Sequence, residues 1–541
     1  MEFLREWGLT AAIFLPLIGV AVMMAFPKTD EGIHKVISLG TSIVVGLIGV
    51  ALLFDFDYDR ADELQWTVDV DWIGIIDAQY AIGIDGISLP LLILTMLITP
   101  LVIIYSWNHF PEPHNPKAFL MLMLVLHTGM IGSFVARDLV LFFVFFEVVL
   151  LPMFFMIAVW GGEDRRYASL KFFLYTLFGS ALMLVSFLAL YFLAGADTFS
   201  IVGLAEGVIE NDVGRTAQIL MFGGMLLGFG IKVPMFPFHT WLPDAHTQAP
   251  TQGSVILAAV LLKLGTYGFV RIAIPILPEG AVFWAPWIGL LAVIGIIYGA
   301  LGCLAQTDMK RLIAFSSVAH MGYVMLGIAT LTDWGINAAI FGMVAHGLIT
   351  GMLFFVAGSL KERYHTLEIK RLGGLLLQAP KMGWILGFIS MASLGLPGLA
   401  GFWGEFPAIL AAYNPANGLP VGLFRAYMII AAIGTVLAAG YLLWLLQRTA
   451  FGTPSEEFAD DPHIVDAHKE EWLAWSPLLV LILLFGLVPG LIFNTTDPAV
   501  EANLSECFSV PTEDKANFDI GLCSSQGVET ALAELGVKVG E

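Results

Sequence analysis

Six ionisable side chains lie inside long apolar runs of this sequence: Glu147, Lys232, Lys263, His320, His346 and Glu405. A lysine in the middle of a bilayer costs about 2.5–3.5 kcal/mol on insertion scales, so such residues are rarely retained without a use. Carboxylates, lysines and histidines all take up and release protons, and histidine does so nearest neutral pH. The residue types therefore predict a proton relay at membrane depth.

Glu147 and Lys232 are interpreted as a charge pair. Glu147 stands in LVLFFVFFEVVLLPMFF, without a polar neighbour in sequence. A carboxylate stays ionised there only beside a cation, which predicts that Lys232 or Lys263 lies close to it. A desolvated lysine can lose its proton, whereas arginine cannot, and this suits both lysines to transfer. The alternatives are a neutral, hydrogen-bonded Glu147 that joins two helices and a Lys232 that extends to the interface.

His320 and His346 lie between Lys263 and Glu405 along the chain, in SSVAHMGYV and GMVAHGLIT. Their order predicts that they connect these two groups, although a histidine in a span is also often a hydrogen-bonded packing residue. Glu405 stands in SLGLPGLAGFWGEFP, where glycines and Pro397 predict a broken helix. We expect Glu405 to be the terminal acid of the relay.

Three further polar residues follow in PFHTWLPDAH: His239, Asp244 and His246. We expect them to line the cytoplasmic mouth, with Asp244 capping the turn into the next helix. A purely structural role is equally consistent with the sequence. His127 is interpreted as packing, and Arg137 and Asp138 as ordinary interfacial charges.

The elements that carry these residues are membrane-spanning helices. The chain has 541 residues, of which 58% are hydrophobic and 13% charged, with a mean hydropathy of +0.83. Apolar runs of about 20 residues recur along it, which predicts an all-α polytopic membrane protein. We expect about fourteen spans: 8–26, 36–54, 84–106, 117–135, 139–159, 170–194, 216–240, 251–273, 282–304, 312–330, 336–358, 381–412, 422–446 and 474–493.

The loops predict orientation and partners. Of the 25 Lys and Arg residues, 15 fall in one alternate set of loops and 8 in the other with the termini, so the first set is predicted cytoplasmic and both termini outside. The first apolar run, Leu9 to Phe26, has no cleavage site and is expected to remain as a span. The net charge of −20 and the acidic loop 55–77 argue against binding nucleic acid.

Three cysteines are present. Cys303 lies in an apolar span and is expected to pack. Cys507 and Cys523 lie in the outer tail, where an oxidising compartment favours a disulfide between them. No cysteine spacing predicts a metal or iron–sulfur site.

Two halves of similar length, 117–273 and 282–446, each contain one interrupted span. About five spans in each half would invert the second half relative to the first, and matched broken helices in inverted halves point to a path near the bilayer midplane. We therefore divide the chain into an N-terminal three-helix region (1–116), an inlet half (117–273), an outlet half (282–446), a cytoplasmic loop with the last span (447–493) and an acidic outer tail (494–541).

The long motif KVPMFPFHTWLPDAHTQAPTQGSVILAAVLLKLGTYG resembles the signature of the antiporter-like membrane subunits of respiratory complex I. The strings LVLFFVFFEVVLLPMFF and QTDMKRLIAFSSVAHMGYV are similar to further motifs of that family, and the resemblance covers roughly residues 80 to 450. Two of the three paralogous subunits carry lysine at the position of Glu405. This chain matches the middle one, which carries glutamate.

The resemblance implies a proton-translocating subunit of NADH:quinone oxidoreductase in a bacterial plasma membrane. It implies Glu147 and Lys232 as the charge pair, Lys263 as the central lysine, His320 and His346 as the connection, and Glu405 as the terminal site. NADH, FMN, iron–sulfur clusters and quinone would belong to other subunits, and this chain would bind no cofactor or metal. Its partners would be the two paralogous subunits and the lipid bilayer.

Two alternative functions are also consistent with the sequence. A subunit of a multi-subunit sodium/proton antiporter would use the same residues with other partners. A scaffold that translocates nothing would leave the four buried charges Glu147, Lys232, Lys263 and Glu405 without a reason.

Overall fold

The computed structural model describes residues 2–459 and 461–502 of the chain. Within these described residues, twelve helices are long and apolar enough to cross a membrane, which confirms the predicted class. They are Leu4–Met24 within α1 (Glu2–Met24), α2 (Glu31–Asp55), α3 (Ser88–Tyr105), α4 (Pro116–Val135), α5 and α6 together (Leu139–Val148 and Leu150–Trp160), α7 (Arg165–Ala194), Thr251–Ile276, α14 (Pro278–Leu304), α15 (Met309–Ala329), α16 (Asp333–Tyr364), α20 (Val421–Thr449) and α21 (Lys469–Leu487).

Two further expected spans are interrupted, as the sequence predicts. The first consists of α9 (Arg215–Lys232), a break at 233–237, the short turn η2 (Phe238–Thr240) and α10 (Trp241–Gln248). The second consists of α18 (Pro380–Ser393), a break at 394–399 and α19 (Ala400–Ala411). Pro234 and Pro237 remove donors in the first break. In the second, Gly395 and Gly398 have φ of 78° and 93°, a conformation that glycine adopts without strain.

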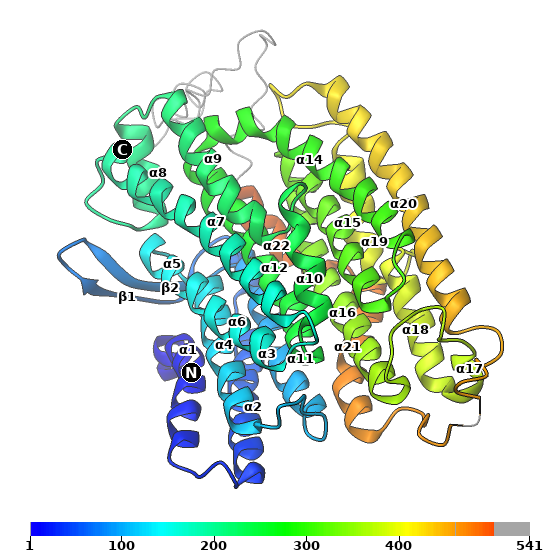
Figure 1. Ribbon diagram of the computed structural model, residues 1–541. Helices are drawn as coiled ribbons and strands as arrows, with labels where there is room; N and C mark the ends of the chain where they lie inside the picture. The colour runs from blue at the N-terminus through cyan, green and yellow to red at the C-terminus, as the bar shows by residue number, and fades with distance from the viewer. Residues whose placement is uncertain (1, 460, 503–541) are drawn as a thin grey trace.

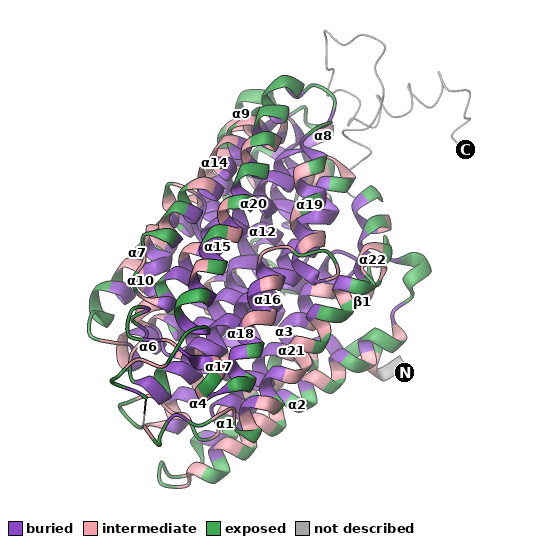
Figure 2. Ribbon diagram, turned by 90° about the vertical axis from the view of Figure 1, so that its right-hand side faces the viewer, coloured by how far each residue is buried: buried purple, intermediate pink, exposed green. Residues whose placement is uncertain are grey.

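The span that carries Lys263 is wound irregularly. It runs through α11 (Thr251–Ile256), η3 (Leu257–Leu261), α12 (Leu262–Gly268), η4 (Phe269–Ala273) and α13 (Ile274–Ile276), and η3 and η4 are π-turns. Such turns inside α-helices are often found at functional sites. This span and α16 are buried throughout their most apolar stretch, so the candidate residues lie in the interior. Figure 2 shows buried residues concentrated on the central helices α12, α15 and α16.

Part of the acidic loop is a β-hairpin, which the sequence analysis did not predict. The strands β1 (Gln65–Ile73) and β2 (Ala78–Ile84) pair antiparallel and project from the helices (Figure 1). Alternation in QWTVDVDWI is the signal that could have identified the first strand. The remaining elements are η1 (Tyr58–Arg60), α8 (Ile201–Glu210), α17 (Leu375–Gln378) and α22 (Gly490–Val500). Cys507, Cys523 and most of the predicted tail lie outside the described residues, whereas Cys303 is buried and free, as expected.

Candidate functional site

Lys263 is fully buried on α12 and forms a hydrogen bond with a histidine of another helix. Its Nζ lies 2.7 Å from Nδ1 of His346 on α16. It also donates to the carbonyl oxygen of Ala258, in the π-turn one turn earlier, at 2.5 Å. Among the described residues, no carboxylate forms an ion pair with Lys263. The lysine is therefore held by neutral acceptors, one of which can itself carry a proton.

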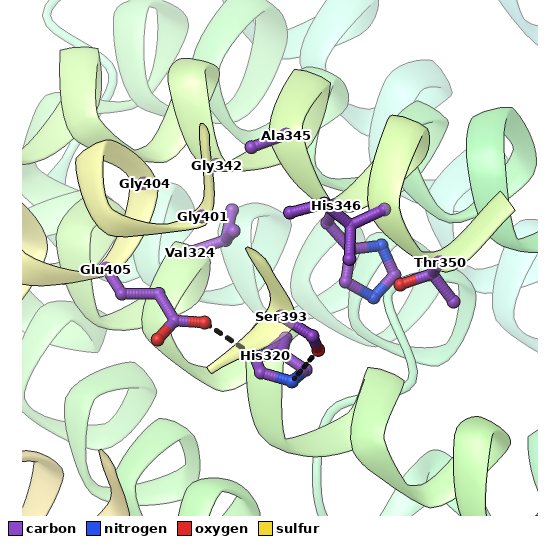
Figure 3. Close-up of a pocket in the computed structure, with 11 residues that line it drawn as sticks. His320, Val324, Gly342, Ala345, His346, Thr350, Ser393, Gly401, Gly404 and Glu405 are labelled. Carbon is purple, nitrogen blue, oxygen red and sulfur yellow. Dashed lines mark hydrogen bonds and ion pairs between the residues drawn. The ribbon is translucent and has the colours of Figure 1, made fainter. Parts of the chain in front are cut away.

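A small cavity separates the two histidines. The ring centroids of His346 and His320 are 6.2 Å apart, and Nε2 of His346 is buried without a hydrogen-bond partner. The cavity, of about 20 Å³, is lined by both rings, Thr350, Ser393 and Glu405; Figure 3 shows these side chains around it. A volume of this size holds about one water molecule, which is the bridge that a proton needs between the two rings.

His320 joins this cavity to Glu405. Its Nδ1 lies 2.5 Å from Oε1 of Glu405 on α19, as Figure 3 shows. On the other side of the ring, Nε2 is within hydrogen-bonding distance of the hydroxyls of Ser393 (3.1 Å) and Tyr441 (2.9 Å). Both ring nitrogens are thus engaged, so the imidazole is oriented toward the carboxylate. Lys263, His346, His320 and Glu405 therefore form one row, in which the first three residues are buried and Glu405 is partly exposed.

Glu147 and Lys232 lie near one another without direct contact. Their charges interact, but no ion pair joins them among the described residues. Nζ of Lys232 instead lies 4.5 Å from the centroid of the Phe146 ring, and Oε1 of Glu147 is buried without a hydrogen-bond partner. Lys232 is the last residue of α9, two residues before Pro234. The charge pair expected from the sequence is therefore open in this structure.

α9 and α12 pack closely beside Lys232. A Cβ added at Gly265 would lie 2.6 Å from the carbonyl oxygen of Phe229 and 3.1 Å from Cβ of Lys232. Glycine is required at this crossing because any side chain would push the two helices apart. The contact brings the helix that carries Lys232 against the helix that carries Lys263.

The three residues after the first break make different contacts. Asp244 lies within α10 and pairs with Lys171 of α7 at 2.8 Å and with Arg311 of α15 at 3.6 Å. No side-chain cap is present on α10 or α11, so the expected capping role is wrong and Asp244 connects helices instead. His239 stacks on Phe236 and Tyr298. His246 is completely buried and stacks on Phe354 at 4.5 Å.

Two residues interpreted as interfacial charges are buried, which corrects that interpretation. Asp138 is 0% exposed and caps α5 by accepting from the backbone N–H groups of Val140 and Leu141. Arg137 donates to the carbonyl oxygen of Gly83 and pairs with Asp85. The folded hairpin buries both residues.

Asp85 also accepts from Nη2 of Arg271 through both carboxylate oxygens, at 2.6 and 2.5 Å. It lies outside the membrane-spanning helices, in the turn before α3. Burial alone would raise its pKa, but Arg271 and Arg137 outweigh burial and lower the pKa of Asp85 to about 2. Two guanidinium groups therefore share one ionised carboxylate.

A second polar cluster lies at the other end of the helices. Nδ1 of His109 is 2.6 Å from Glu362, and these two residues and Glu471 place one ligand atom each within 4.8 Å of one another. Burial opposes the charged form of His109, but the Glu362 carboxylate prevails and raises the pKa of His109. Arg363 occupies both oxygens of Glu471, at 2.9 and 2.7 Å. This arrangement binds the loop after α3 to α16 and α21 through ion pairs.

Four buried polar residues were not predicted from the sequence: Ser393, Tyr441 and Thr350, which lie beside the row, and Lys310. Hydroxyl side chains cost little in a membrane helix, so nothing in the sequence singles them out. Lys310 stands at a predicted loop boundary, yet it is only 3% exposed. His127 is buried, and neither ring nitrogen has a hydrogen-bond partner.

Comparison with known proteins identifies the family to which this chain belongs. Residues 136–431 match the family model for the membrane region of NADH:quinone oxidoreductase and Mrp antiporter subunits. Residues 63–133 match the model for the amino terminus of NADH-ubiquinone oxidoreductase chain 4. The two matches together cover the N-terminal hairpin and most of the helices described above.

Curated relatives match almost the full length. NADH-quinone oxidoreductase subunit M of Rhodobacter capsulatus is 41% identical over 506 residues, which covers 91% of this chain and 95% of the relative. Subunit M of Rickettsia bellii is 38% identical, with 92% and 99% covered. A chain 4 of the NAD(P)H-quinone oxidoreductase of Trichormus variabilis is 38% identical, with 92% and 91% covered.

Solved structures share the fold. A chain of respiratory complex I from Thermus thermophilus superposes with a TM-score of 0.80 at 29% identity, covering 92% of this chain and 99% of that chain. A chain of the Mrp complex from Dietzia superposes with a TM-score of 0.79 at 21% identity, covering 98% and 55%. The second likeness concerns the fold alone.

Proposed function

The chain belongs to the subunit M (chain 4) family of NADH-quinone oxidoreductases, and from this premise we propose that it moves protons across the membrane through its buried row of ionisable residues. As a membrane subunit of that enzyme it has partner subunits, to which NADH oxidation and quinone reduction belong. The proposal concerns the part that this chain contributes, which is proton translocation driven by those reactions.

The observation that carries the proposal is the unbroken row from Lys263 to Glu405. Nζ of Lys263 contacts His346, a cavity of about 20 Å³ connects His346 to His320, and His320 contacts Glu405. A proton released by Lys263 is accepted by the His346 imidazole, crosses one water and passes through His320 to the Glu405 carboxylate. Each donor in this sequence has an acceptor within hydrogen-bond or single-water reach.

Glu147 and Lys232 would control delivery to this row. Lys232 keeps its proton more firmly when the Glu147 carboxylate approaches it and releases it more readily when the carboxylate withdraws. The open pair corresponds to the releasing arrangement. A neighbouring subunit could shift this balance, because Glu147 is only partly buried.

The same proposal includes the wider organisation. The breaks after Lys232 and before Glu405 would lie in two inverted halves, 117–273 as inlet and 282–446 as outlet. The chain would span a bacterial plasma membrane with both termini outside. NADH, FMN, iron–sulfur clusters and quinone would be bound by partner subunits, and the two paralogous antiporter-like subunits would be its neighbours.

The rival is a subunit of a sodium/proton antiporter, which shares the fold. The likeness to the Mrp chain carries no functional weight at 21% identity, whereas the relatives at 38–41% identity are all named as quinone oxidoreductase subunits. The identity of the subunits that co-purify with the chain decides between the two.

The direct test uses the complete complex reconstituted into liposomes. Lys263→Met and Glu405→Gln each remove one member of the row. We expect NADH-driven proton translocation to fall about a hundred-fold or more, because a positioned proton-transfer group contributes about 10²–10⁴-fold to a rate. Glu163→Gln, at an exposed loop carboxylate, is the matched control and should pump normally. Normal pumping by both row variants would overturn the proposal.

A further inference from the structure

A large cavity, lined by both charged and apolar residues, opens beside the N-terminal end of the helix that carries Lys263. Its volume is about 860 Å³. Its walls come from the loop after α3, the turn between α10 and α11, the start of α15, the end of α16 and the loop before α21. All these segments belong to loops that the Lys and Arg count assigns to the cytoplasmic side.

Lys310 is the buried cation in the wall of this cavity. Its side chain is almost completely covered, and its Nζ donates to the carbonyl oxygen of Ala249, at the turn that leads into α11. No ion pair joins it to a carboxylate among the described residues; Asp308, the nearest acid along the chain, caps α15 instead. A buried lysine without a contacting counter-ion can give up its proton.

His246 lies one turn before Ala249, the residue whose carbonyl oxygen accepts from Lys310. Its ring is completely buried against Phe354, and neither Nδ1 nor Nε2 has a hydrogen-bond partner. Both Lys310 and Lys263 act on this ring electrostatically. A buried polar ring with two unused nitrogens is costly, and its interaction with two lysines supplies a reason for keeping it.

We propose that Lys310 and His246 form a second cytoplasmic proton inlet, which leads from this cavity to Lys263 without passing Lys232. The proposal rests on the proposed function, since it supplies the same row.

The protons balance along this inlet. Neither His246 nitrogen contacts a lysine directly, so each transfer passes through water. The ammonium of Lys310 gives a proton through water to one nitrogen of the neutral His246 ring. The resulting imidazolium gives a proton from its other nitrogen, again through water, to the neutral amine of Lys263. Lys310 regains a proton from water in the cavity. Lys263 then carries the proton that it passes to His346.

The decisive variant is His246→Phe in the reconstituted complex. Phenylalanine keeps the stacking on Phe354 and removes both nitrogens, which form no hydrogen bond that the fold would lose. Its matched control is His127→Phe, at a histidine that is likewise buried and unpartnered but lies on α4, away from the cavity. We expect His246→Phe to pump protons at half the wild-type rate or less, because only the Lys232 route remains, and His127→Phe to pump normally.

The role of Lys310 is tested with two variants that distinguish proton transfer from a purely structural role. Lys310→Met removes the proton and the bond to Ala249, whereas Lys310→Arg keeps a charged donor that does not deprotonate. If Lys310 transfers protons, both variants should pump slowly. If Lys310 has only a structural role, Lys310→Arg should pump at the wild-type rate. Lys361→Met, at an exposed lysine that lines the same cavity, is the control.

The outcomes separate this inlet from the proposed function. Normal pumping by His246→Phe, or rescue by Lys310→Arg, overturns the inlet while a loss in Lys263→Met retains the row. Normal pumping by both Lys263→Met and Glu405→Gln overturns the row itself. If Lys310→Met prevents assembly, His246→Phe still decides.

Discussion

At the scale of single residues, the carboxylate of Asp85 balances two buried guanidinium groups. Arg271 is on the same span as Lys263, about two turns away, and Arg137 precedes α5. One negative charge between two positive ones leaves a net positive cluster in the interior. Such a group is stable only while the carboxylate stays ionised, because a cation without its partner is far more costly than the intact pair.

We predict that Asp85→Asn destabilises the protein by about 3–5 kcal/mol, the usual cost of breaking a buried pair from one side. The folded-state pKa of Asp85, about 2, lies below the value of 3.8 that an aspartate has in the unfolded chain. The stabilisation by Asp85 is therefore fully present above this unfolded-state pKa and is lost as the pH falls through about 2. The deficit should be constant between about pH 5 and pH 8, measured as thermal unfolding of the purified complex in detergent.

Arg5→Gln is the control for this prediction, since the pair of Arg5 with Asp55 involves an exposed guanidinium, and such pairs contribute about 0–1 kcal/mol. Equal stability of Asp85→Asn and the wild-type protein would contradict the assigned role.

The relay residues could be predicted because charge at membrane depth is expensive and stands out in a sequence. This argument identifies Lys263, His346, His320 and Glu405, which the structure brings together. It cannot identify Ser393 and Tyr441, whose hydroxyls orient His320, since a hydroxyl is cheap in any helix. Nor can it find Lys310, because burial of a residue at a loop boundary depends on tertiary packing.

At the scale of elements, the position of Glu405 depends on how closely α19 lies against α16. A Cβ added at Gly404 would be 2.5 Å from Cα of Gly342, so the two backbones touch at this crossing. Small residues permit such close packing in membranes. The contact sets the distance from Glu405 to the helices that carry both histidines.

Gly404→Ala should therefore separate α19 from α16, with a loss of about 1–3 kcal/mol typical of overpacking and a clear loss of proton translocation. Gly387→Ala is the matched control: it lies inside α18, and nothing is within 4 Å of the added Cβ, so it should be neutral or slightly stabilising. Reconstituted pumping and thermal unfolding check both. Normal behaviour of Gly404→Ala would show that the contact can relax without consequence.

The elements themselves were predictable to different degrees. The helices could be predicted from long apolar runs, and both breaks from prolines and glycines, because these features act on the local backbone. The β-hairpin was missed because acidic residues alternate with apolar ones in a segment that reads as a loop by charge. The open arrangement of Glu147 and Lys232 was not predictable either, since residue types determine that two charges interact but not the distance at which they rest.

At the scale of the whole molecule, the proposed path has a direction. The cavity beside Lys310 lies at one end of the central helices, and the Asp85 cluster lies beside the hairpin near the other end. The proposed inlets therefore require the loops near Lys310 to face the cytoplasm. This requirement agrees with the distribution of Lys and Arg, which is an independent argument.

Orientation is tested by cysteine labelling from one side, in a background in which Cys507 and Cys523 are replaced by serine; Cys303 is buried. Ile75 is 96% exposed at the tip of the hairpin, and Glu163 is exposed in the loop before α7. A maleimide that cannot cross the membrane should label Ile75→Cys in intact spheroplasts and leave Glu163→Cys unlabelled. Both should react after permeabilisation, which controls for shielding by partner subunits. The opposite pattern would place the large cavity outside and reverse the direction of proton flow, because the inlets would then open to the wrong compartment.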